Sequence, residues 1–127
     1  MGGEVDSKAI LMVEDNADNA DLATWMLEDA DYSVVVAATA EAGLALLEEH
    51  QYAIILMDIS LPGMDGKDAI RLIRANPNLS GVPIIALTAH AVLNERDAIM
   101  ASGADCIVTK PIDEDLLLLK LDEMILN

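Results

Sequence analysis

The sequence contains few aromatic residues, a single cysteine and few basic residues. Phe is absent, and one Trp and two Tyr make up 2% of the 127 residues, although 54% of the chain is hydrophobic. The core must therefore be built from aliphatic side chains and Met. One Cys excludes an internal disulfide framework, and no Cys and His spacing typical of a zinc site occurs. A chain of this length can bury about two thirds of its unfolded surface as one domain.

The scarcity of basic residues excludes several classes of partner. The chain has 7 Lys and Arg against 23 Asp and Glu, so its formal charge is -16. A surface of this charge repels the phosphates of DNA and of anionic lipids. The apolar runs are far shorter than the roughly 20 residues that cross a bilayer, and the first residues lack a signal-peptide pattern. We expect a cytoplasmic protein without direct contacts to DNA or membrane.

Five short apolar runs divide the sequence at regular intervals. They are continuous rather than alternating, which is typical of parallel strands covered on both faces. The segments between them have helical spacing, with Asp65 and Asp113 as helix caps and Gly103 at a helix end. This pattern predicts an α/β domain with a doubly wound parallel sheet over residues 8–127, after a disordered arm or expression remnant at residues 1–7. The runs cover residues 9–13, 34–37, 53–57, 83–87 and 106–109.

Polar side chains follow four of these runs. Glu14 and Asp15 follow the first run and Asp58 the third, while Thr88 and Lys110 follow the fourth and fifth. Such residues meet at the carboxyl edge of a parallel sheet, where open α/β sheets bind ligands. Three crowded carboxylates need a cation, and an all-oxygen set favours Mg²⁺, with Mn²⁺ as the alternative. Asp58 is then the candidate nucleophile for phosphoryl transfer, with Lys110 and Thr88 contacting the phosphoryl oxygens.

The residues around these positions resemble the receiver domain of two-component response regulators, over about residues 8–126. The resemblance rests on four segments together: Glu14-Asp15, residues 58–66 (Asp-Ile-Ser-Leu-Pro-Gly-Met-Asp-Gly), residues 87–90 (Leu-Thr-Ala-His) and residues 109–112 (Thr-Lys-Pro-Ile). It implies a flavodoxin-like sheet with strand order 2-1-3-4-5. A stand-alone regulator, a chemotaxis-regulator-like protein and a part of a hybrid kinase all remain open.

The resemblance also implies roles for the site residues. Asp58 would be the phosphoacceptor, and Mg²⁺ would be held by Glu14, Asp15, Asp58 and the backbone carbonyl of Ser60. Lys110 would pair with the acceptor or its phosphate, Thr88 would move toward the phosphoryl group, and the Lys110-Pro111 bond would be cis. The phosphodonor would be a histidine kinase or a histidine phosphotransfer protein. Such a chain catalyses its own phosphorylation and dephosphorylation but has no turnover substrate.

One position departs from the family pattern. The family commonly has Tyr or Phe three residues before the lysine, where this chain has Ile107. On the last helix, Leu116 and Leu119 point away from the predicted inward face, which consists of Leu117, Leu121, Met124 and Ile125. We therefore expect a downstream partner, or a homodimer contact, at a surface of the fourth helix, fifth strand and last helix centred on Ile107, Leu116 and Leu119.

Two other functions stay open at this point. The first is a phosphate-independent interaction or dimerisation module of the same fold, which the change at Ile107 favours. The second is a metal-dependent phosphohydrolase, although Ser60 stands where such nucleophile motifs often have a second aspartate. Trp25, Cys106 and the methionines are interpreted as packing residues, and Gly63 and Gly66 as turn residues.

Overall fold

The computed structural model describes residues 8–90 and 92–125, so the prediction of an arm at residues 1–7 lies outside the described residues. Five parallel strands form one sheet in the order β2-β1-β3-β4-β5. This order confirms the predicted doubly wound fold, with β3 at the centre. The strands are β1 (Ala9–Val13), β2 (Ser33–Ala37), β3 (Ile54–Asp58), β4 (Ile84–Thr88) and β5 (Cys106–Thr109).

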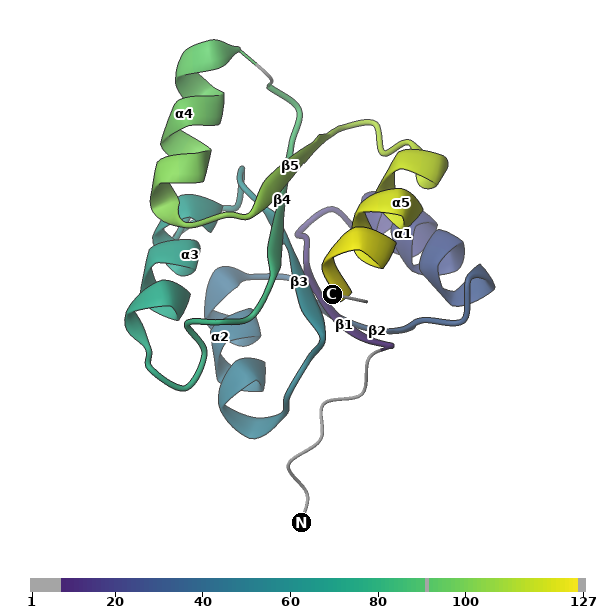
Figure 1. The fold of residues 1–127 in the computed structure, drawn as a ribbon, viewed down its shortest axis with the longest axis horizontal. Coiled ribbons are helices and arrows are strands. Elements are labelled where there is room, and N and C mark those ends of the chain that lie inside the picture. The colour runs from purple at the N-terminus through teal and green to yellow at the C-terminus, as the bar shows by residue number, and fades with distance from the viewer. Residues whose placement is uncertain (1–7, 91, 126–127) are drawn as a thin grey trace.

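Five helices alternate with the strands and cover both faces of the sheet. Figure 1 shows α1 (Ala17–Asp29) and α5 (Glu114–Ile125) on one face. The other face is covered by α2 (Ala40–Glu49), α3 (Gly66–Ala75) and α4 (Leu93–Ser102). None of the helices in the described part of the chain combines the length and apolar content needed to cross a membrane.

Alternate residues of each central strand pack into opposite layers of the core. In β1, Leu11 and Val13 belong to the cluster under α2, α3 and α4, whereas Ile10 and Met12 belong to the cluster under α1 and α5. All four are fully buried. Because side chains alternate along a strand, a continuous apolar run is needed to fill both layers. On α5, the predicted inward residues Leu117 and Leu121 are also fully buried.

The predicted helix signals are present as hydrogen bonds. Asp65 precedes α3 and accepts a bond from the Asp68 amide at 3.0 Å, and Asp113 accepts one from the Leu116 amide at 3.1 Å. Gly103 ends α4 with φ 121°. Each cap satisfies a backbone group that the helix itself leaves unpaired.

Some details differ from the sequence predictions. Asp58 and Thr88 belong to β3 and β4 rather than following them, because they pair in register with Leu87 and Thr109. β2 is not covered on both faces: Val35 and Val36 are each 41% exposed, since this strand forms an edge of the sheet. The interpretation of Trp25 as a packing residue is wrong. Its side chain is 63% exposed, because Ala20, Ala23 and Leu27 form the buried face of α1.

Two neighbouring residues of α3 test the assignment of the core. Ile73 is fully buried, whereas Leu72 is 50% exposed. We expect Ile73→Ala to lower the free energy of unfolding by about 2–5 kcal/mol through lost burial and a cavity. Leu72→Ala removes the same number of carbon atoms and should change it by about 0.5 kcal/mol or less. Urea denaturation of both variants measures the difference, and equal losses would contradict the assigned face.

Candidate functional site

The carboxyl ends of the four strands β1, β3, β4 and β5 bring the predicted site residues to one edge. Glu14 follows β1 directly and its amide donates to the Ala37 carbonyl of β2 at 2.9 Å. Asp58 is the last residue of β3, and Thr88 the last of β4. Lys110 follows β5, and its amide donates to the Thr88 carbonyl at 2.8 Å. Hydrogen bonds between the backbones of neighbouring strands therefore fix the backbone position of each candidate site residue.

Lys110 joins two buried carboxylates. Its ammonium Nζ lies 2.9 Å from Oε1 of Glu14 and 3.1 Å from Oδ2 of Asp58. The two carboxylates are almost fully buried, with side-chain exposures of 1% and 3%, and Lys110 is 18% exposed. In such surroundings a lone ion would be strongly disfavoured, so the shared ammonium compensates both charges.

The protonation of this group follows from burial and pairing. Burial raises the pKa of Glu14, and the nearby Asp58 raises it further, against the opposing effect of Lys110 and the Asn16 amide. Burial alone would lower the pKa of Lys110, but its contacts with Glu14 and Asp58 outweigh this, and the pKa is raised. Lys110 thus stays an ammonium ion at neutral pH.

The acidic group fits a divalent cation. Oxygens of Glu14, Asp15 and Asp58 lie within 4.8 Å of one another. Asp15 is exposed, while the other two are buried. In their ionised forms, three carboxylates and the Lys110 ammonium leave two negative charges uncompensated. An all-oxygen donor set with this charge is what Mg²⁺ prefers.

Two further predicted residues are held by local hydrogen bonds. The Ser60 amide donates to Oδ1 of Asp58 at 3.1 Å, which turns this backbone segment toward the carboxylate. The Thr88 hydroxyl accepts from the His90 amide at 3.0 Å and donates to the His90 carbonyl at 3.1 Å. Thr88 is therefore at the predicted edge, but its hydroxyl is bonded to its own loop. The Lys110-Pro111 bond is cis, as the resemblance implied.

Two residues support the site in ways that the sequence did not indicate: Asn16 was not singled out, and Gly66 was interpreted only as a turn residue. The Asn16 side chain caps α1 by accepting from the Asn19 amide, and the backbone amide of Asn16 donates to Oε2 of Glu14 at 3.2 Å. Gly66 is the first residue of α3 rather than a plain turn residue. A Cβ there would collide with the Asp58 carbonyl oxygen and lie 2.8 Å from Cα of Ile59. An Asn directly after the acidic pair and a Gly directly after Asp65 were the available signals.

A comparison with protein families identifies the family of this chain. The model of the response regulator receiver domain matches residues 10–122. The chain belongs to this family. As a receiver domain, it is a phosphorylation-activated signalling domain rather than an enzyme with a turnover substrate.

Known proteins similar to this receiver domain include both long and short chains. Sensor protein GacS of Pseudomonas syringae pv. syringae is 40% identical over 119 residues, which cover 90% of this chain but 13% of GacS. The polar-differentiation response regulator DivK of Brucella ovis is 31% identical over 106 residues, 84% of this chain and 86% of DivK.

A solved structure gives the same result in three dimensions. It is the receiver domain of a sensor histidine kinase from Pseudomonas aeruginosa PAO1, with a magnesium ion coordinated in its active site cleft. The two chains are 37% identical and superpose with a TM-score of 0.89 over 94% of this chain and 98% of the other.

The tight approach of α3 to β3 gives a prediction for Gly66. We expect Gly66→Ala to push the first turn of α3 off the Asp58 backbone and to lower the free energy of unfolding by about 1–3 kcal/mol. Gly81→Ala is the matched control, because nothing lies within 4 Å of a Cβ at that position. Denaturation together with amide chemical shifts of Asp58 and Ile59 measures both effects. Unchanged shifts in Gly66→Ala would refute the predicted displacement.

Proposed function

We propose that this receiver domain accepts a phosphoryl group on Asp58 from a phosphohistidine of a histidine kinase or a histidine phosphotransfer protein. The observation that carries the proposal is the environment of Asp58, which is buried at the central strand beside two other carboxylates and the Lys110 ammonium. The signalling role of the family and the kinase relatives support the choice of donor.

The transfer needs position and charge more than covalent chemistry from the protein. One carboxylate oxygen of Asp58 forms the new P–O bond while the P–N bond of the phosphohistidine breaks, and its electron pair stays on the imidazole nitrogen. The Ser60 amide and the Lys110 ammonium already hold the two oxygens of Asp58, so little reorganisation is needed. Lys110 then neutralises one phosphoryl oxygen, and Thr88 donates to another after leaving His90.

The metal would be held by Glu14, Asp15, Asp58 and the backbone carbonyl of Ser60, with Mg²⁺ as the ion and Mn²⁺ as a substitute. When bound, it supplies positive charge against the carboxylates and the phosphoryl oxygens. The clustered oxygens support this assignment, as does the magnesium ion in the Pseudomonas aeruginosa relative. The same site would also hydrolyse the aspartyl phosphate, which returns the domain to its resting state.

The donor would approach over α1. A hollow of about 370 Å³ beside Lys110 is lined by Leu22 and Met26 of α1 and by Ile112 of the following loop. Leu22 and Trp25 are 55% and 63% exposed. Exposed apolar side chains next to a reactive group favour docking of another protein there. We place this exchange in the cytoplasm, with residues 8–127 as the receiver unit.

Removal of the Asp58 carboxylate tests the proposal. We expect Asp58→Asn to abolish Mg²⁺-dependent labelling by acetyl phosphate, because the amide is a poor nucleophile. Asp65→Asn is the control, since Asn caps a helix as well as Asp and should leave labelling intact. Mass spectrometry of the labelled protein with and without EDTA measures both requirements. Labelling retained on another residue would disprove the assignment, and failure to label the unaltered chain would favour the phosphate-independent module.

We further propose that phosphorylation changes a partner or homodimer surface around α4, β5 and α5. Leu116 and Leu119 of α5 are 39% and 54% exposed. Ile107 is half-buried on edge strand β5 and packs with the core cluster under α4, on the opposite face from α5. The surface would therefore extend around the β5 edge of the sheet. A shift of the Ile107 side chain there would change the positions of both α4 and α5.

A double substitution tests this surface. We expect Leu116→Ser with Leu119→Ser to weaken the association of the phosphorylated domain with its partner, or with itself, about tenfold or more. Leu72→Ser on α3 is the control, because Leu72 is a leucine that is 50% exposed on a different helix. Analytical ultracentrifugation and pull-down measure association, while labelling of Asp58 should stay intact. An unaltered association constant would place the interface elsewhere.

A further inference from the structure

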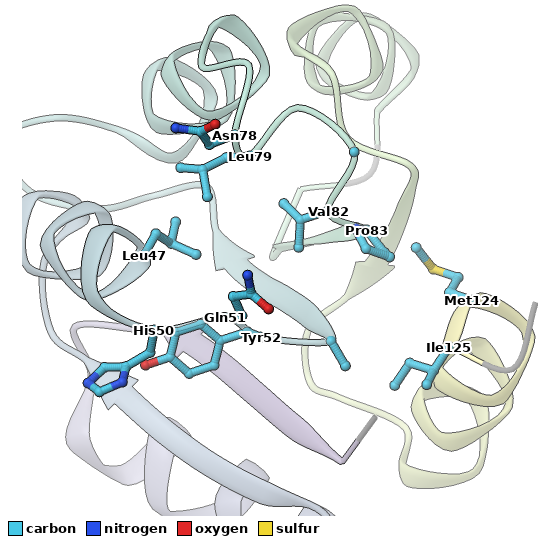
Figure 2. Close-up of a pocket in the computed structure, with 12 residues that line it drawn as sticks. Leu47, His50, Gln51, Tyr52, Asn78, Leu79, Val82, Pro83, Met124 and Ile125 are labelled. Atoms are coloured by element: carbon cyan, nitrogen blue, oxygen red, sulfur yellow. The ribbon is translucent and has the colours of Figure 1, made fainter. Parts of the chain in front are cut away.

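A hollow of about 500 Å³ opens at the amino-terminal edge of the sheet, at the opposite ends of the strands from Asp58 (Figure 2). It lies where β3 and β4 begin. Figure 2 shows the segment around Leu47, His50 and Tyr52 on one side and Met124 and Ile125 of α5 on the other. We call this hollow the amino-edge groove.

The amino-edge groove has an apolar floor. The side chains of Leu47 and Tyr52 are buried. Those of Leu79, Val82 and Ile125 are partly buried and pack against the core. Within residues 8–90 and 92–125, no Asp, Glu, Lys or Arg lines the groove. Such a floor accepts an apolar side chain rather than an ion.

The two sides of the groove are negative. α2 ends at Glu49 and the described part of α5 reaches Ile125, and neither helix has a basic residue in its last described turn. The carboxyl ends of helices carry partial negative charge that these helices leave unbalanced. Glu49 adds a carboxylate at the end of α2, and Tyr52 in the groove wall follows three residues later; burial raises the pKa of the Tyr52 phenol and Glu49 raises it further.

Arg74, the cation that contacts the loop of residues 78–83, is already engaged. Arg74 donates to the carbonyls of Ser80 and Val82 and pairs with Asp105 at 2.7 Å. Its charge is therefore compensated locally. With a formal charge of -16 on the whole chain, the groove lies in a negative field.

We propose that the amino-edge groove binds a segment of a partner protein that inserts an apolar side chain between flanking Lys or Arg residues. The apolar floor accommodates the anchor, and the negative ends of α2 and α5 on opposite sides attract one basic flank each. Because the groove lies at the far edge from Asp58, the segment binds without competing with the phosphodonor. It thus forms a second recognition site, independent of phosphorylation.

Gln51 offers a sharp test, since it is exposed and lines the groove. The probe is a fluorescent peptide that has two leucines flanked on each side by a pair of arginines. The control peptide has the same sequence with every arginine replaced by glutamate. Fluorescence anisotropy at physiological salt should show binding of the basic peptide alone. Gln51→Lys should weaken it about two- to fivefold, and Gln51→Glu should tighten it by a similar factor.

The controls separate the groove from general attraction to an acidic protein. Asn94→Lys adds the same charge on exposed α4, at the carboxyl-edge side of the molecule, and should leave affinity nearly unchanged. Labelling of Asp58 should be normal in every variant, which verifies folding. Equal weakening by Gln51→Lys and Asn94→Lys, equal binding of the acidic peptide, or amide shifts away from the groove would each overturn the proposal.

Discussion

The contact of one ammonium with two buried carboxylates governs the functional edge of this domain. Glu14 and Asp58 leave β1 and β3 side by side, and without Lys110 their charges would repel in a medium that hardly screens them. Lys110 extends from the end of β5, so it also ties an outer strand to the centre of the sheet. A change of charge at Asp58 therefore acts directly on Lys110 at the end of β5.

The proximity of the site residues could be predicted from sequence because parallel topology brings the ends of strands together. Asp58, Glu14, Asp15 and Lys110 each follow or end an apolar run, and this position alone implied their proximity. The exposure of Trp25 could not be predicted, since it depends on which side of α1 meets the sheet. Likewise, the closeness of Gly66 to the Asp58 backbone arises from how α3 packs on β3, which no local pattern records.

The two edges of the sheet differ in chemical character. The carboxyl edge gathers buried charges that need a counter-ion, whereas the amino edge gathers apolar side chains between the negative ends of helices. Both properties follow from the alternation of parallel strands and helices, which directs every helix carboxyl end to the same side. A doubly wound domain of this kind can thus separate a reactive site from a recognition site by the length of its strands.

The loop bond of Thr88 has a consequence for the resting domain. Its hydroxyl forms a closed pair of hydrogen bonds with the His90 backbone, and both must break before it can turn toward Asp58. A net value of about 1 kcal/mol for each bond would keep the turned form to a few per cent of molecules. Under the proposed mechanism, spontaneous activation would therefore be rare until a phosphoryl oxygen provides a better acceptor for the Thr88 hydroxyl.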